Sequence, residues 1–120
     1  MAVETAKGLW NVQTQVVTKD ANPAIGATIT LPDGVTEILL EIPTLNNASV
    51  NVQVLSEDGV TWLTAVCPGD SAVPIADTMA ASTGARTWNV SRLALAGRGA
   101  RVLLGAVQTT ASRTFYWMSR

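Results

Sequence analysis

The alternation of apolar and polar residues is clearest between Ser49 and Val66, and it predicts a β-hairpin. The segment begins Ser-Val-Asn-Val-Gln-Val-Leu-Ser, so that Val50, Val52 and Val54 share one face of a strand. Asparagine and glutamine alternate with these valines on the other face. Because side chains in a strand point to opposite faces with a period of two, the valine face is expected to be buried.

A turn signal follows this first strand. Asp58-Gly59 supplies residues that tolerate positive φ, which a tight hairpin turn requires. Val60, Trp62 and Val66 then repeat the period of two after the turn. This pattern places Trp62 within the apolar alternation, and core anchoring is its more ordinary role.

Shorter alternating segments occupy most of the remaining chain, separated by turn residues such as Pro32-Asp33-Gly34 and Gly97-Arg98-Gly99. In the first of these segments Trp10, Val12 and Val16 alternate with polar residues, which indicates an apolar face made by these three. After the segment at 86–90, we expect a bend and a short continuation of the strand at 93–95. The predicted strands are 9–18, 25–31, 35–42, 86–90, 100–108 and 113–118.

About eight short strands with regular turns predict an all-β fold, a two-layer antiparallel β-sandwich with the jelly roll as one form of it. Residues 1–8 read as an N-terminal arm, and residues 9–120 as a single β-sandwich domain. Residues 68–85 show no clear strand and exceed ordinary connection lengths. Because this loop is rich in alanine and other apolar residues, it is a candidate contact surface, in which we single out Ile75 and Met79.

Charged residues make up only 14% of the 120 residues, whereas about 25% is usual for a soluble domain. Few charges are therefore available to cover the surface of a small protein. Neutral polar residues on exposed faces, and burial of surface against other subunits, are the two ways to cover it. The second way suggests a protein that assembles with other subunits.

The charges are divided unevenly between the two parts of the chain. Residues 1–80 hold nine acids and two lysines, a net charge of −7, whereas residues 81–120 hold six arginines and no acid, a net charge of +6. One explanation is pairing between strands of the same sheet. The other is an interface in which arginines make bidentate contacts with a partner. The candidates on these strands are Arg86, Arg92, Arg98, Arg101, Arg113, Tyr116 and Trp117.

The C-terminal strand carries consecutive aromatics, Phe115, Tyr116 and Trp117. Consecutive residues of a strand cannot all point to the same face. Either Tyr116 or the Phe115 and Trp117 pair must therefore face outward or meet a second layer, which makes this strand a candidate contact surface.

Residues for catalysis are scarce. The chain has no histidine, which removes the usual general base and the commonest metal ligand. Its one cysteine, Cys67, cannot build a thiolate zinc site or an internal disulfide. Glu37 and Glu41 would lie about 13 Å apart on a strand, at roughly 3.3 Å per residue, which is too far for a glycosidase pair. We expect a non-enzymatic protein without a cofactor.

Other ligands are less simply dismissed. Asp58, Asp70 and Asp77 lie in expected loops and could offer oxygen ligands to calcium, although no spaced acidic motif is present. Four of the six aromatic residues are tryptophans, and outward-facing Trp62 or Trp88 would suit a carbohydrate-binding module. A carbohydrate-binding role therefore stays open as an alternative.

The sequence gives little indication of binding to membranes or nucleic acids. The N-terminal residues lack the apolar stretch of a signal peptide, and no run approaches the roughly 20 apolar residues of a membrane helix. A net charge of −1 gives no overall attraction to nucleic acid, and no RNA-binding aromatic motif is present. We expect a protein made in a cytoplasm that binds neither membranes nor nucleic acid.

The seven residues Ser56-Glu57-Asp58-Gly59-Val60-Thr61-Trp62 resemble a hairpin motif, Ser-x-Asp-Gly-x-Thr-Trp, seen in many β-sandwich virion proteins of tailed bacteriophages. Ile-Pro-x-Leu at 42–45 and the alternating strands are similar to those proteins too. The motif also occurs in β-propeller repeats and sugar-binding modules. The resemblance implies a structural protein of the virion, most simply a capsid decoration or cement protein that binds the major capsid protein as a homo-oligomer, a trimer or a dimer. Another phage structural role, in a tail, fibre or neck, is the first alternative.

Overall fold

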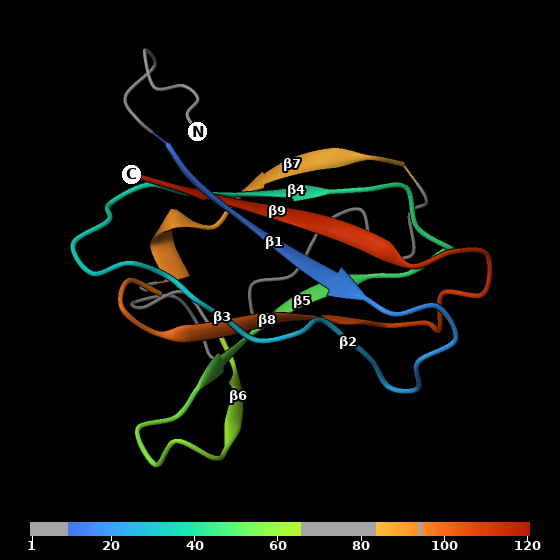
Figure 1. Cartoon of the computed structure of the whole chain (residues 1–120), viewed down its shortest axis with the longest axis horizontal. Helices are drawn as coiled ribbons and strands as arrows, with labels where there is room; N and C mark the ends of the chain where they lie inside the picture. Colours follow the sequence, from blue (N-terminus) through green and yellow to red (C-terminus); the bar gives the residue numbers. More distant parts are fainter. Residues whose placement is uncertain (1–9, 66–83, 94) are drawn as a thin grey trace.

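The computed structural model describes residues 10–65, 84–93 and 95–120. Two antiparallel sheets form the layers of a sandwich, with the strand order β1-β9-β4-β7 in one and β2-β8-β5-β6 in the other, where β3 also pairs with β8 (Figure 1). The strands are β1 Asn11–Val17, β2 Ala24–Ile25, β3 Ile29–Thr30, β4 Ile38–Ile42, β5 Val50–Leu55, β6 Trp62–Thr64, β7 Arg86–Asn89, β8 Gly99–Leu104 and β9 Arg113–Ser119.

The strands pair in a nested order from the ends of the chain inward. β1 pairs with β9, β2 and β3 pair with β8, β4 pairs with β7, and β5 pairs with β6. Two further pairings, β4 with β9 and β5 with β8, join these pairs into sheets. When β2 and β3 are counted as one interrupted strand, this is the eight-stranded order of a jelly roll. The predicted all-β antiparallel sandwich is confirmed.

Local differences from the prediction have identifiable causes. The expected strand at 25–31 is interrupted because Gly26 N–H donates to Val102 of β8 whereas Ala27 N–H donates to Val16 of β1, so the chain changes partner between them. The sequence predicted a continuation of the strand at 93–95. The structure instead has a 3-10 turn, Ser91–Leu93, so Leu93 is not part of a strand. The strand expected at 100–108 ends at Leu104, where Gly105 N–H turns to the Ser49 carbonyl.

The core lies between the two sheets. The predicted buried valines of β5 are confirmed, since Val50 and Val52 are 0% exposed and Val54 is 6% exposed. They meet the inward residues of the other sheet, among which Phe115 and Trp117 are the largest fully buried side chains. The valines of β5 thus share one core with two large aromatic side chains and with aliphatic residues of the facing sheet, among them Leu40 and Ile42.

The first strand faces the other way from the prediction. Val12 and Val16 of β1 are 48% and 40% exposed, whereas Gln15 and Val17 are buried. The register explains this reversal, because β1 pairs Gln15 with Phe115 and Gln13 with Trp117, and both aromatic residues point inward. Residues that are paired across an antiparallel ladder share a face.

Gln15 is stable inside the sandwich because its amide is fully hydrogen-bonded. Its Nε2 donates to the carbonyls of Ala27 (2.6 Å) and Ala100 (3.1 Å). Its Oε1 accepts from Val102 N–H (3.0 Å) and from Trp117 Nε1 (3.2 Å). One side chain of β1 thereby joins the edge of the four-stranded sheet to β8 in the facing sheet.

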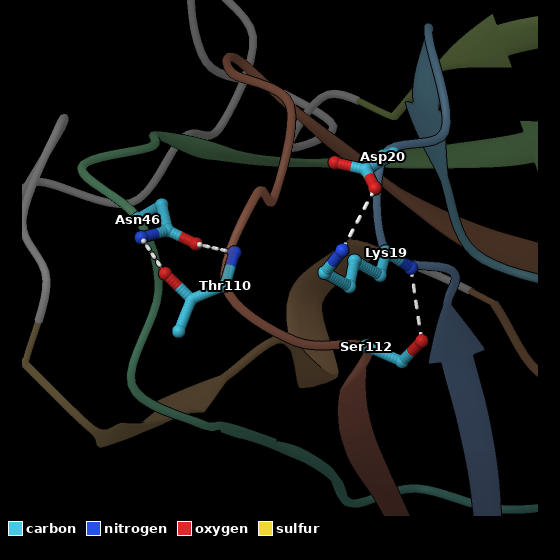
Figure 2. Close-up of polar contacts among 5 residues, drawn as sticks. All are labelled: Lys19, Asp20, Asn46, Thr110 and Ser112. Atoms are coloured by element: carbon cyan, nitrogen blue, oxygen red, sulfur yellow. Dashed lines mark hydrogen bonds and ion pairs between the residues drawn. The ribbon is translucent and has the colours of Figure 1, made fainter.

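A polar network closes one end of the sandwich, where the loops after β1, β4 and β8 meet (Figure 2). Asn46 Nδ2 donates to Thr110 Oγ1 (2.9 Å), and Thr110 N–H donates back to Asn46 Oδ1 (3.2 Å). Lys19 N–H donates to Ser112 Oγ (2.9 Å), while Lys19 Nζ contacts Asp20 at 3.0 Å. These contacts connect loops that are far apart in sequence and so fix this end of the fold.

Several expectations concern residues that lie outside the described part of the chain. They are the N-terminal arm at 1–8, Cys67, the loop at 68–85 except for its last two residues, and with it Asp70, Ile75, Asp77 and Met79.

Candidate functional site

Arg113 is occupied by contacts within its own chain. Its Nε donates to Gln108 Oε1 (3.1 Å), and its Nη2 donates to Asn46 Oδ1 (2.9 Å). Gln108 is itself fully buried and also accepts from Asn46 N–H at 2.7 Å. Arg113 therefore braces the loop end shown in Figure 2, and the structure gives its guanidinium an internal role.

The other arginines are spread over the molecule instead of forming one basic edge. Arg86 begins β7 and donates to the Gly84 carbonyl, and partial burial lowers the pKa of its guanidinium. Arg92 is exposed on the 3-10 turn. Arg120 forms a 2.6 Å ion pair with Glu37 and stacks over the Trp10 ring, 4.1 Å from its centroid. Some arginines of residues 81–120 therefore contact groups of the same chain.

Tyr116 and Trp117 have opposite positions. Tyr116 is 42% exposed on the outer face of its sheet. Trp117 is 0% exposed and donates to Gln15, so its inclusion among the surface candidates was wrong. The strand alternation offered both possibilities, and the buried aromatic pair is the one that fills the space between the layers.

An apolar surface covers the outer side of the four-stranded sheet. The register aligns Val12, Met118 and Leu39 in one row across β1, β9 and β4, and aligns Thr14, Tyr116 and Glu41 in the next. We call this surface the tyrosine face. It consists of Val12, Val16, Leu39, Tyr116 and Met118.

Charge is nearly absent from the tyrosine face. Among the outward strand positions that the structure describes on this sheet, Glu41 is the one charged residue. Val12, Val16 and Tyr116 are three of the five large apolar side chains that are recorded as exposed in the described residues. Their gathering on the outer side of one sheet makes this face suitable for burial against another protein.

The outer side of the five-stranded sheet is different in character. Its apolar residues come from four strands. Among the outward strand positions that the structure describes on this sheet, Arg101 is the one charged residue. We call this surface the tryptophan face. It consists of Ile25, Leu55, Trp62, Arg101 and Leu103.

Trp62 belongs to this outer face, contrary to the expected role in the core. It pairs with Leu55, which alternates with the buried Val54 and therefore points outward. Arg101 stacks on the Trp62 ring, with its guanidinium carbon 4.0 Å from the centroid. Arg101 Nε donates to Gln53 Oε1 (2.8 Å), and partial burial lowers the pKa of the guanidinium.

Arg98 lies beside the same face. Its Nη2 donates to the Leu55 carbonyl at 3.3 Å. Arg98 and Arg101 are thus brought to the same side of the molecule. Arg86, Arg92 and Arg113 belong to β7, the 3-10 turn and β9, which are not part of this sheet. Gln53 had no predicted role, and the signal for it is its position opposite Arg101 in the ladder.

Asp58 serves the hairpin turn. Its Oδ1 accepts from Val60 N–H and Thr61 N–H, both at 2.8 Å, and its Oδ2 accepts from the Thr61 hydroxyl at 2.7 Å. These hydrogen bonds, led by that of the Thr61 hydroxyl, lower the pKa of the carboxyl group. Gly59 has φ +75°, as the turn signal predicted.

Within the described residues no cluster of three or more histidine, cysteine or acidic side chains could hold a metal ion. No described helix is long and apolar enough to cross a membrane. A scan against protein-family models, a search of curated proteins and a search of solved structures each found no match.

Proposed function

We propose that this protein is a non-enzymatic structural protein of a virion, a decoration or cement protein that bridges neighbouring subunits of a phage capsid. The tyrosine face is the observation that carries the proposal. A protein that works by adhesion needs a stiff body and a surface whose burial releases ordered water, and this face offers three exposed apolar side chains on the outer side of one sheet.

The two outer faces support a bridging role. The tyrosine face and the tryptophan face lie on opposite sides of the sandwich, because they are the outer surfaces of its two layers (Figure 1). A body that contacts one neighbour on each side adds buried area across a junction and increases the work needed to separate the neighbours. The jelly roll suits this task, since it is a fold of viral capsid domains. The seven-residue hairpin resemblance points to the same class.

A sedimentation assay tests this proposal. Shells of the virus that encodes the chain, prepared without this protein, are mixed with it and pelleted. We expect the purified protein to co-sediment up to a fixed ratio and to raise the temperature at which the shells open. A protein that stays in the supernatant at every concentration would contradict the proposal.

A carbohydrate-binding module is the second candidate, and the outward position of Trp62 is the observation that favours it. Aromatic rings on the outer face of a sandwich can stack on sugar rings, and jelly rolls also include lectin domains. A glycan array decides between the two. Specific glycan binding that Trp62→Ala removes without loss of the fold would support this second function.

A further inference from the structure

The guanidinium of Arg101 is held in place from two sides. Trp62 of β6 lies under it, and Gln53 of β5 accepts a hydrogen bond from its Nε. Three adjacent strands thereby fix one flexible side chain, because Arg101 itself belongs to β8. Stacking of this kind retains the charge while it limits the rotamers of the arginine.

Among the described residues, no protein group accepts a hydrogen bond from the two Nη groups of Arg101. They carry four N–H donors, and the contacts of Arg101 in the described part of the chain are those with Gln53 and Trp62. The outer end of the fork is therefore available. Two parallel N–H groups in one plane match the two oxygens of a carboxylate.

The surroundings favour an acidic ligand. No acid occupies an outward strand position of the described five-stranded sheet, so no described strand residue of this face competes for the fork. Leu55 and Leu103 flank it with apolar surface. A central tryptophan and arginine with an apolar surround is the composition of binding hot spots in protein interfaces.

We propose that the tryptophan face is an anchoring site for an acidic protein segment, in which Arg101 binds an aspartate or glutamate carboxylate end-on through Nη1 and Nη2. The proposal rests on the proposed function, because it names the chemistry of the shell surface that one side of the bridge would contact. Charge complementarity selects this partner, since one oriented fork suits a single carboxylate. A nucleic-acid backbone would need a track of cations.

The test uses the purified full-length protein without shells, so that it can succeed or fail independently of the proposed function. A hexaglutamate peptide is titrated while NMR follows the Arg101 Nε–H and Trp62 Nε1–H signals. We expect saturable shifts of both signals, weaker binding at high salt, and roughly tenfold weaker binding by Arg101→Lys, which keeps the charge but loses the planar fork.

Matched controls decide what the shifts mean. Arg92→Lys, on the 3-10 turn away from this face, should bind the peptide like the original protein. Equal binding by Arg101→Lys, or no saturable shift, would overturn the proposal. Saturable shifts with inorganic phosphate or with a neutral oligosaccharide, and none with the peptide, would overturn it in favour of those ligands. A circular dichroism spectrum confirms that each variant is folded.

Discussion

Gln15 shows how much of this sandwich depends on one polar side chain. Its amide makes four hydrogen bonds, to groups on β8, on β9 and on the segment between β2 and β3. Gly26 makes room for it, because a Cβ at that position would lie 2.6 Å from Gln15 Oε1. The side chain thus acts as a bridge between the two layers.

Gln15→Leu tests this bridge. The substitution keeps the size of the side chain but leaves two donors and two acceptors unpaired in the interior. We expect a loss of about 3 kcal/mol or more in the free energy of unfolding, measured with urea.

Gln13→Leu is the matched control on the same strand. Its side chain is only partly buried and makes one hydrogen bond, to the Thr30 carbonyl. We expect a loss below about 1 kcal/mol. Equal losses for the two variants would show that Gln15 has no special structural role.

At the residue level, the sequence could not reveal which face of β1 is buried. Its alternation was read correctly, yet the row of Trp10, Val12 and Val16 contains more apolar surface than the row of Gln13, Gln15 and Val17. Hydrophobic count therefore favoured the wrong face. Three of the four partners of Gln15 lie 85 to 102 residues away in sequence, so no local pattern could indicate them.

At the level of elements, the strands were predictable and their partners were not. Most turns fall where glycine, proline and aspartate predicted them, as at Gly34 and Gly59, which both have positive φ. The outward position of Trp62 could have been found. A turn centred on Asp58 and Gly59 places Trp62 opposite Leu55, and Leu55 alternates with the buried valines. Turn position, more than apolar content, fixes the faces of a hairpin.

The apolar positions of the tyrosine face could be found only once the register was known. Val12, Met118 and Leu39 come from three strands that are distant in sequence. The scattered arginines have the same explanation, since charge counts along the chain do not show which face each strand presents.

The β5–β6 hairpin should depend on pH through Asp58. The folded pKa of this carboxyl group lies below its ordinary value of about 3.9, so its stabilising contribution is complete above that value and is lost as pH falls through the folded pKa. We expect the protection of the Val60 and Thr61 amide hydrogens, measured by NMR as exchange relative to an unfolded chain at the same pH, to fall as pH falls through the folded pKa. Asp58→Asn should remove most of this pH dependence, and an unchanged profile in that variant would contradict the assignment.

The tyrosine face gives a prediction at the level of a whole sheet. Tyr116→Ala removes a large exposed side chain from its middle, and we expect about tenfold weaker binding to shells or more. The melting temperature should change little, because the side chain is 42% exposed. Val60→Ala is the control, since Val60 is 77% exposed in the turn between β5 and β6 and is a residue of neither face. Equal effects of the two substitutions would argue against this face.

At the scale of the whole molecule, the fold indicates how the proposed connector would keep its shape. Nested strand pairing ties both ends of the described chain into one sheet, and the polar network around Asn46 and Gln108 closes one end of the sandwich. In the described part of the chain, these hydrogen bonds and the apolar core hold the body in shape. Its two outer faces are then left for contact with other proteins.

The most direct test of the central claim is a density map of the intact virus particle. The bridging account predicts a jelly roll seated at a junction between two capsid subunits, with the tyrosine face against one and the tryptophan face against the other. Density for the protein in the tail or neck, a position in which both faces meet solvent, or its absence from the particle would contradict this account.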